Sequence, residues 1–397
     1  MSNDDQQPHQ HKKRRVDAYP SFRLNHTESY QGSFPVYKQP QEITSYSIDH
    51  ERRVWFDNRE MKYYYPPTSD KKDLNVGYDK MIQRDESIPE HIDTLLDALT
   101  NANAKQPDDN QITADIVTWR GIMTKILCTP YSRKEPWELR ATKYNGTIYM
   151  EEQVTDKKKN SENQASDRQK LMSYWGYRFE TLCTVTKPPH EMTKKDPELQ
   201  ERLTASANTN IQYCILAKTK LGSNSIIMGA EVDCCRDVKP KDPLQQPSNY
   251  IELKTSRVIE SERNQYSFDR YKLLKFWAQS FLIGVPRVIC GFRDDQGIVL
   301  DVVQFKTLEI PRQVREKRNT WNPSVCLNFA NQVLDWIRSV ITQDDPTVTY
   351  AIRFDYPFQE ITVECTGHSH VFLTQRFLDG TIQHDIGGPR ASGVSES

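Results

Sequence analysis

The chain has 397 residues, 36% of them hydrophobic, which is enough to bury a large core without disulfide or metal staples. Its 53 lysine and arginine residues against 54 aspartate and glutamate residues give a net charge of −1, which argues against binding nucleic acid through a uniformly basic surface. No apolar run approaches the roughly 18 residues that a membrane span needs, so we expect no membrane partner.

Both ends of the chain have the composition of polar tails. Residues 1–20 and 379–397 are poor in apolar residues and follow no period, so we expect disorder there and a single folded domain over 21–378. The N-terminal tail lacks the apolar segment of a secretory signal, which predicts a reducing compartment and free thiols at the eight cysteines. The basic run Lys12–Arg15 fits a nuclear import signal or a solvated charge run.

The first half of the chain predicts two helices around a mixed region. Apolar residues in 91–99 recur at helical spacing, and the aromatic-rich stretch 171–183 has the same pattern. Between them, 114–131 follows no clean period and places Trp119, Arg120 and Gly121 at an expected bend. The polar stretches predicted to be surface loops are 101–111, 156–168 and 187–202.

Strands outnumber helices in the second half. The predicted strands are 210–219, 225–237, 250–259, two runs within 287–305 joined by Asp-Asp-Gln-Gly as in a hairpin, and 347–357. The predicted helices are 268–284, which ends at a glycine with a proline just beyond, and 326–341. The pattern therefore predicts an α/β (α+β) domain of mixed β-sheets flanked by helices.

Three carboxylates and one lysine stand at two-residue spacing on two of these strands. Side chains two apart on a strand point the same way, so Glu231 and Asp233 share one face, and Glu252 and Lys254 share another. Pairing of the two strands would gather the carboxylates beside the ammonium. Because close carboxylates repel one another, a hard divalent cation such as Mg²⁺ or Mn²⁺ would stabilise such a cluster.

Lys254 favours phosphoryl chemistry over a purely structural metal site, where an ammonium would only compete with the ion. Asp233, Glu252 and Lys254 together follow the motif of the PD-(D/E)XK nucleases. Taken alone, this motif is explained equally well by alternating charges on a strand that faces solvent.

Four more residues are candidates for the same site. Glu180 is either a fourth carboxylate ligand or a surface glutamate, and Gln279 in an apolar helix either reaches the site or lies at the helix rim. Arg120 fits a phosphate-binding fork or a structural ion pair. Trp119 fits a stacking platform for a base or, more commonly, a core residue.

Five motifs together extend the comparison to nearly the whole chain. They are WRG at 119–121, GYRFE at 176–180, GAEVD at 229–233, ELKT at 252–255 and FWAQS at 276–280. In this order they resemble the DXO-like family of decapping nucleases, and most of all its fungal members, which partner the nuclear five-prime exoribonuclease. The resemblance runs from about residue 20 to residue 375.

The resemblance implies a PD-(D/E)XK-like core and a role for each motif residue. Catalysis would rest on Glu231, Asp233, Glu252 and Lys254, and the divalent metal would be held by Glu180, Glu231, Asp233, Glu252 and the carbonyl of Leu253. Substrate would be contacted by Glu231, Lys254, Gln279, Trp119, Arg120, Gly121, Cys214 and, less firmly matched, Glu86. A further substrate arginine would be Arg52 or Arg53.

The function implied is hydrolysis at the five-prime end of RNA. Family members act on unmethylated guanosine caps, NAD caps and five-prime triphosphates and leave a monophosphate. A nuclear location and a partnership with the exoribonuclease are implied as well, and a mainly non-catalytic role as activator of that exoribonuclease is the alternative. A DNA endonuclease of the same fold is disfavoured by the near-neutral charge and the absence of a recognition module.

Overall fold

The computed structural model describes residues 19–67, 72–155, 164–240 and 248–382. The strands within these residues form two β-sheets. The larger sheet has ten strands, in the spatial order β1 (Ser21–Arg23), β16 (Glu360–Gly367), β15 (Asp345–Phe354), β6 (Trp137–Tyr144), β7 (Thr147–Glu152), β5 (Ile116–Trp119), β10 (Asn224–Glu231), β9 (Gln212–Leu221), β2 (Tyr37–Ile48) and β3 (Val54–Trp55). The smaller sheet has the order β14 (Val299–Lys306), β13 (Arg287–Arg293), β12 (Tyr250–Arg257), β11 (Cys234–Cys235), β4 (Tyr63–Tyr64) and β8 (Thr184–Val185).

Both sheets are mixed, as the sequence predicts. In the larger sheet β5 runs parallel to β10 and to β7, and its other pairs are antiparallel. In the smaller sheet β12 is parallel to β13, and β11 is parallel to β4. The predicted hairpin is confirmed as β13 and β14, with Gly297 in its turn at a φ of 87°.

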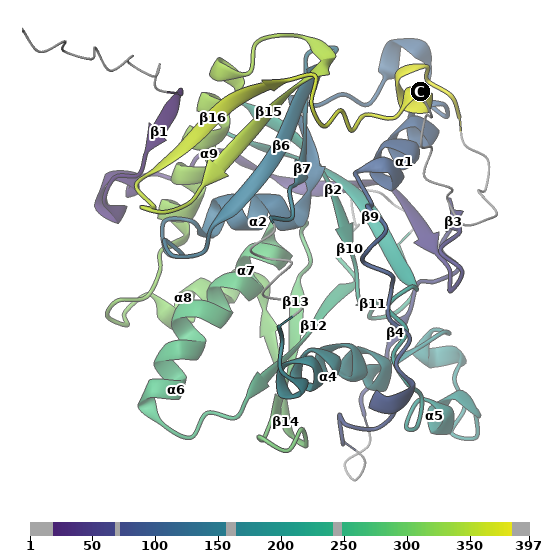
Figure 1. Cartoon of the computed structure of the whole chain (residues 1–397). Coiled ribbons are helices and arrows are strands. Elements are labelled where there is room, and N and C mark those ends of the chain that lie inside the picture. Colours follow the sequence, from purple (N-terminus) through teal and green to yellow (C-terminus); the bar gives the residue numbers. More distant parts are fainter. Residues whose placement is uncertain (1–18, 68–71, 156–163, 241–247, 383–397) are drawn as a thin grey trace, which may run out of the picture.

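The helices cover the faces of the two sheets (Figure 1). They are α1 (Asp93–Asn103), α2 (Arg120–Cys128), α4 (Asp167–Cys183), α5 (Glu198–Glu201), α6 (Glu262–Ser267), α7 (Leu273–Leu282), α8 (Ile310–Val314), α9 (Pro323–Val340) and α10 (Gln375–Leu378). The helix α1 packs on one face of the larger sheet, while α2, α7 and α9 share the main core on its other face. The smaller sheet packs one face against this main core and the other against α4.

This layering decides where the side chains of β12 point. Ile251 and Leu253 belong to the apolar cluster under α4, whereas Tyr250 belongs to the main core shared with α2 and α7. Since successive side chains of a strand alternate between faces, Glu252 and Lys254 point to the same side as Tyr250, toward α2. The fold thus turns the E-x-K segment inward, between the two sheets.

Some predicted elements have other bounds in the structure. Residues 268–284 begin as a turn of π-helix (Phe268–Lys272) before α7, and Gly284 follows the helix at a φ of 75°, as expected of a terminating glycine. The helix predicted at 91–99 continues to Asn103, into the stretch expected to be a loop. The loop predicted at 187–202 contains α5, so that prediction is wrong there.

The predicted tails lie mostly outside the described residues, as do Lys12–Arg15 and residues 156–163 of one predicted loop. Within the described ranges, no helix combines the length and apolar character needed to cross a membrane. All eight cysteines are free thiols, as expected, and each except Cys365 is buried.

Candidate active site

Glu252 and Lys254 form the centre of the candidate site. The Nζ of Lys254 lies 2.5 Å from Oε1 of Glu252, and Nη1 of Arg120 lies 2.9 Å from Oε2, so each carboxylate oxygen has a cationic partner. Glu252 is 2% exposed. Burial opposes its ionisation, but the charges of Arg120 and Lys254 outweigh burial and lower the pKa of Glu252 to about 2. Glu252 is therefore an ionised carboxylate inside the protein.

Arg120 reaches Glu252 because of the transition from β5 to α2. Strand β5 ends at Trp119 and the helix begins at Arg120, at the bend predicted from the sequence. Trp119 packs beside Gly229 of β10, where an added Cβ would lie 2.6 Å from a Trp119 ring carbon. Trp119 is thus half-buried against two core clusters, while Gly121 is exposed in the first turn of α2.

Glu231 is the last residue of β10 in the larger sheet and Asp233 follows two residues later, and here one prediction is wrong. Strands β10 and β12 do not pair, because β10 belongs to the larger sheet and β12 to the smaller one. The two strands are linked instead through β11, whose residue Cys234 pairs with Ile251. Asp233 lies directly before β11, and its Oδ2 accepts the backbone N–H of Leu253 at 2.6 Å. The carboxylates therefore meet across a junction between sheets.

Glu180, on α4, completes a set of four carboxylates. Burial and then the neighbouring charges of Asp233 and Glu231 raise the pKa of Glu180 well above its ordinary value. Burial and then the charge of Glu252 likewise raise the pKa of Asp233, to about 7. These shifts mean that the carboxylates resist being ionised together unless positive charge is added.

A cavity of about 320 Å³ opens beside these carboxylates. Its lining combines both signs of charge and includes Lys62, Arg84, Glu86, Glu180, Glu231 and Asp233. Tyr177, 43% exposed, presents an aromatic ring at the same cavity. Charged groups beside an accessible aromatic ring suit a ligand that has both phosphates and a flat ring.

Comparison with known proteins shows the family of the chain. Residues 38–378 match the family described as RAI1 like PD-(D/E)XK nuclease. The chain belongs to this family. The decapping and exoribonuclease protein of Xenopus laevis is 38% identical over 339 residues, which cover 82% of this chain and 82% of that protein.

Solved structures agree with the RAI1-like assignment. Candida albicans Rai1, in complex with pU5 and Mn²⁺, superposes with a TM-score of 0.83 at 28% identity and covers 91% of this chain and 99% of that one. Scheffersomyces stipitis Rai1, in complex with (3'-NADP)+ and calcium ion, has a TM-score of 0.80 at 28% identity and covers 90% of this chain and 99% of that one. The RAI1-like, PD-(D/E)XK-like fold inferred from the motifs is confirmed, and the chain is a nuclease-family hydrolase.

The donor chemistry of this RAI1-like site fits a divalent metal, although its side chains are not gathered around one. Within the described ranges, no three His, Cys, Asp or Glu side chains converge closely enough to hold an ion. The raised pKa values of Glu180 and Asp233 nevertheless show carboxylates whose mutual repulsion a cation would relieve. Arg120 and Lys254 contact one oxygen of Glu252 each, and because each carboxylate oxygen has two lone pairs, Glu252 keeps an acceptor site for a cation.

The structure separates the two candidate arginines of the RAI1-like site. Arg52 donates through Nη1 to Oε1 of Gln212 at 2.7 Å, and its Nη2 lies 2.6 Å from Oε1 of Glu90. Gln212 in turn contacts Glu231, so Arg52 lies at the margin of the site. Arg53 instead pairs with Asp49, at 2.8 Å, within its own turn. Gln212 and Glu90 were missed by sequence reasoning, since neither belongs to a motif.

The remaining predicted substrate residues lie at different distances from the cavity. Cys214 is buried on β9 in register with Glu231, and Glu86 lies exposed on the cavity wall. Gln279 is half-buried on α7 and is not among the residues that line the cavity. The structure thus places Cys214 in register with Glu231 and Glu86 on the same cavity wall as Glu231, whereas Gln279 is neither on that wall nor on a neighbouring strand.

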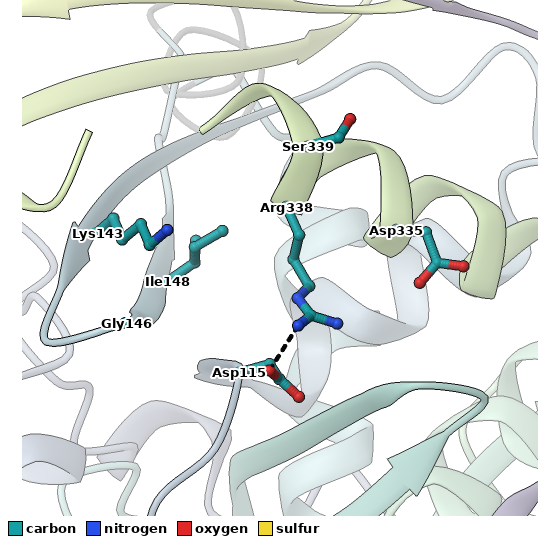
Figure 2. A pocket seen from close by; sticks show the side chains of 7 residues that line it. All are labelled: Asp115, Lys143, Gly146, Ile148, Asp335, Arg338 and Ser339. Atoms are coloured by element: carbon teal, nitrogen blue, oxygen red, sulfur yellow. Dashed lines mark ion pairs between the residues drawn. The ribbon is translucent and has the colours of Figure 1, made fainter. Parts of the chain in front are cut away.

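A second cavity, of about 270 Å³, lies between α9 and the β6–β7 hairpin (Figure 2). Arg338 points toward Asp115, and their ion pair measures 2.8 Å. Asp335 nearby accepts the side-chain amide of Asn224 at 2.8 Å. Arg338, Asp115 and Asp335 thus already have protein partners in this cavity.

Proposed function

We propose that this protein is a divalent-metal-dependent decapping hydrolase that acts on the five-prime ends of RNA and leaves a five-prime monophosphate. The observation that carries the proposal is the buried Glu252 carboxylate held between Lys254 and Arg120, with Asp233 hydrogen-bonded to the same strand. The RNA and Mn²⁺ in the Candida albicans Rai1 structure support it, as does the nicotinamide dinucleotide in the Scheffersomyces stipitis structure.

The proposed roles follow the motifs. The cation, Mg²⁺ or Mn²⁺, would be held by Glu180, Glu231, Asp233, Glu252 and the carbonyl of Leu253. Once bound, it would supply positive charge to the phosphate and lower the pKa of a water. Lys254 and Gln279 would contact the scissile phosphate and the water. The RNA would be held by Trp119, Arg120, Gly121, Cys214, Glu86 and Arg52.

One reaction accounts for the different substrates. Water attacks the phosphorus atom that becomes the new five-prime monophosphate, the bond to the bridging oxygen breaks, and the leaving group departs with that oxygen. The leaving group is the cap dinucleotide, pyrophosphate or, for an NAD cap, a nicotinamide-bearing nucleotide. Lys254 stands beside Glu252, where its ammonium can stabilise charge that develops on the phosphate oxygens.

The test is incubation of the purified protein and Mg²⁺ or Mn²⁺ with four RNAs, which carry monophosphate, triphosphate, unmethylated-cap and NAD-cap ends. We expect release of a leaving group from at least one of the last three, and no release by the Glu231→Ala/Asp233→Ala variant. Inertness of the native protein on all four RNAs would contradict the proposal and favour the non-catalytic alternative.

We also propose that the protein acts in the nucleus as a partner of a five-prime-to-three-prime exoribonuclease in RNA quality control. The proposal rests on the resemblance to the fungal RAI1-like proteins and on the basic run Lys12–Arg15. Co-purification of the exoribonuclease with the full chain, at the same yield with Glu231→Ala/Asp233→Ala, is the expected result. Absence of the exoribonuclease from purifications of the native chain would contradict it.

A further inference from the structure

The side chain of Gln212 connects two parts of the site that are far apart in the sequence. Its Oε1 accepts from Nη1 of Arg52 at 2.7 Å, and its Nε2 donates to Oε2 of Glu231 at 3.0 Å. Among the residues that the structure describes, Gln212 is the only hydrogen-bond partner of the Glu231 carboxylate. The predicted roles of the motif residues do not include Gln212.

The sheet places Gln212 at this position. It is the first residue of β9, and Cys214, two residues along, is in register with Glu231 of β10. Residues two apart on a strand share a face, so the side chain of Gln212 lies diagonally across from that of Glu231. A glutamine is long enough to span this diagonal.

Arg52 is held in place by the turn between β2 and β3. The Oδ1 of Asp49 accepts the backbone N–H groups of Glu51 and Arg53, both at 2.9 Å, and Arg52 takes a φ of 64°. This left-handed conformation is unusual for a residue other than glycine. The guanidinium is fixed further by the carbonyl of Asn210, at 2.9 Å. Arg52 is therefore a firm anchor for Gln212.

The two neighbours allow only one orientation of the Gln212 amide. A guanidinium has donors and no acceptor, so the amide oxygen must face Arg52. The amide nitrogen is the only donor of the Gln212 side chain, so it is the atom that faces the acceptor Oε2 of Glu231. Rotation of the amide by 180° would lose both hydrogen bonds. Gln212 therefore always presents a donor to Oε2 of Glu231.

Glu231 needs such a partner because it is exposed. A glutamate at the surface samples several rotamers, and fixing one of them costs conformational entropy each time a ligand requires it. The hydrogen bond from Gln212 keeps the carboxylate of Glu231 turned along the sheet and leaves Oε1 without a protein partner among the described residues. Groups that orient a metal ligand in this way raise the affinity for the metal.

We propose that Gln212 is a positioning residue, which holds the Glu231 carboxylate in the orientation needed to ligate the divalent cation. The inference rests on the metal assignment in the proposed function and deepens it. Gln212 touches neither the metal nor the scissile phosphate in this proposal; it acts through Glu231. Its second contact, with Arg52, makes the orientation of Glu231 depend on the turn between β2 and β3.

The test measures direct binding of Mn²⁺ to the full chain without RNA. Binding is monitored by calorimetry or by the loss of the electron paramagnetic resonance signal of the free ion. Methionine has nearly the length and volume of glutamine but cannot donate a hydrogen bond, so the variant is Gln212→Met. We expect its affinity for Mn²⁺ to be about tenfold weaker than that of the native protein. Gln304→Met, an exposed change on the edge strand β14, is the control and should bind as the native protein does.

A double-mutant cycle separates action through Glu231 from a general loss of structure. If Gln212 acts only through that carboxylate, Gln212→Met added to Glu231→Gln should cause no further loss of Mn²⁺ affinity. In RNA hydrolysis, Gln212→Met should raise the Mn²⁺ concentration for half-maximal rate by a similar factor, while kcat at saturating Mn²⁺ recovers. Additive losses in the cycle would overturn the inference.

The outcomes distinguish this inference from the proposed function. Mn²⁺ affinity of Gln212→Met within twofold of the native value would overturn the inference, whatever the native protein does to RNA. A native protein that binds Mn²⁺ and shows the Gln212 effect, yet hydrolyses none of the RNAs, would leave the inference standing and contradict the proposed function. A native protein that binds no Mn²⁺ would overturn both.

Discussion

The carboxylate of Asp233 accepts the backbone N–H of Leu253 at 2.6 Å. This hydrogen bond joins the segment that follows β10 of the larger sheet to β12 of the smaller one, and so links the two parts of the chain that carry the carboxylates. The contact needs only an acceptor oxygen, whereas the carboxylate of Asp233 would also bring negative charge to the divalent cation. The two roles of Asp233 can therefore be separated by a change of charge at constant shape.

Asp233→Asn should retain the fold and lose activity. The amide oxygen still accepts from Leu253, so we expect a melting temperature close to the native one, whereas the rate of RNA hydrolysis should fall by about 10²–10³-fold. Single-turnover rates and thermal unfolding measure the two effects. Asp301→Asn is the control, since Asp301 also accepts a backbone N–H, at 2.8 Å, but on the exposed edge strand β14. A native rate in Asp233→Asn would refute the site assignment.

A second contact between the sheets is centred on the buried carboxylate of Glu42, whose ion pair with Lys239 should stabilise the native fold. Lys239 lies 2.5 Å from Oε1 of Glu42 on β2, and the hydroxyl of Tyr250 on β12 donates to Oε2 at 2.8 Å. Lys239→Met leaves the Glu42 carboxylate buried without its cation, which should cost about 3 kcal/mol of unfolding free energy, measured by urea denaturation.

Two further variants check this explanation. Glu42→Gln combined with Lys239→Met removes the uncompensated charge and should recover part of the loss. Lys306→Met removes an exposed pair with Glu309, where Lys306 is 66% exposed, and should change stability by less than about 1 kcal/mol. Equal losses in Lys239→Met and Lys306→Met would rule out a stabilising role for the buried pair.

The pair of His91 and Glu151 should make stability depend on pH. Nδ1 of His91 lies 2.9 Å from Oε2 of Glu151, and this hydrogen bond, opposed by partial burial, raises the pKa of His91 above its ordinary value of 6.5. A raised histidine pKa stabilises the fold fully below 6.5, and that stabilisation is lost as the pH rises through the folded-state pKa. Because His91 is 46% exposed, the effect should stay below about 1 kcal/mol.

The measurement is the unfolding free energy of the native protein and of His91→Asn, from below pH 6.5 to above the folded-state pKa of His91. The difference between them should be largest below pH 6.5 and should shrink as the pH rises. His50→Asn is the control, since Nε2 of His50 lies 3.9 Å from Glu51 in an exposed pair. A difference that grows with pH would reverse the predicted sign and exclude the pair as its cause.

Arg52 and Arg53 should differ in their effect on substrate binding. Arg52 reaches Gln212 at the margin of the site, whereas Arg53 pairs with Asp49 in its turn. Arg52→Met should therefore raise the KM for capped RNA by about tenfold, as expected for the loss of one charge-assisted hydrogen bond. Arg53→Met should leave the KM near the native value. The opposite order of the two KM values would assign the substrate role to Arg53.

Local pattern was enough to predict the centre of the site. The two-residue period of a strand places Glu252 and Lys254 on one side, and the structure confirms this with a contact of 2.5 Å. The helical period likewise predicts α1 and α4, which carries Glu180. Both predictions concern residues that are close together in the sequence. Their relative directions are set by the strand or helix itself and do not depend on the rest of the fold.

The pairing of strands far apart in the sequence was not predicted correctly from the sequence. The strands of Glu231 and Glu252 were expected to pair directly, but they belong to different sheets, and the two-residue strand β11 pairs with β12 instead. Nothing in the apolar sequence of β11 distinguishes it from a continuation of β10. Gln212 meets Arg52 across 160 residues of chain, and Arg120 meets Glu252 across 132. No local period encodes these contacts, since they are set by the order of strands within the sheets.

The most direct test of the central claim uses RNA with a five-prime triphosphate, hydrolysed in water enriched in oxygen-18 with Mn²⁺ present. We predict that the native protein releases unlabelled pyrophosphate and leaves one oxygen-18 atom in the five-prime monophosphate, and that Lys254→Met does so far more slowly. Label in the released pyrophosphate, stepwise release of orthophosphate, or an undiminished rate in Lys254→Met would contradict hydrolysis at that phosphorus by this site.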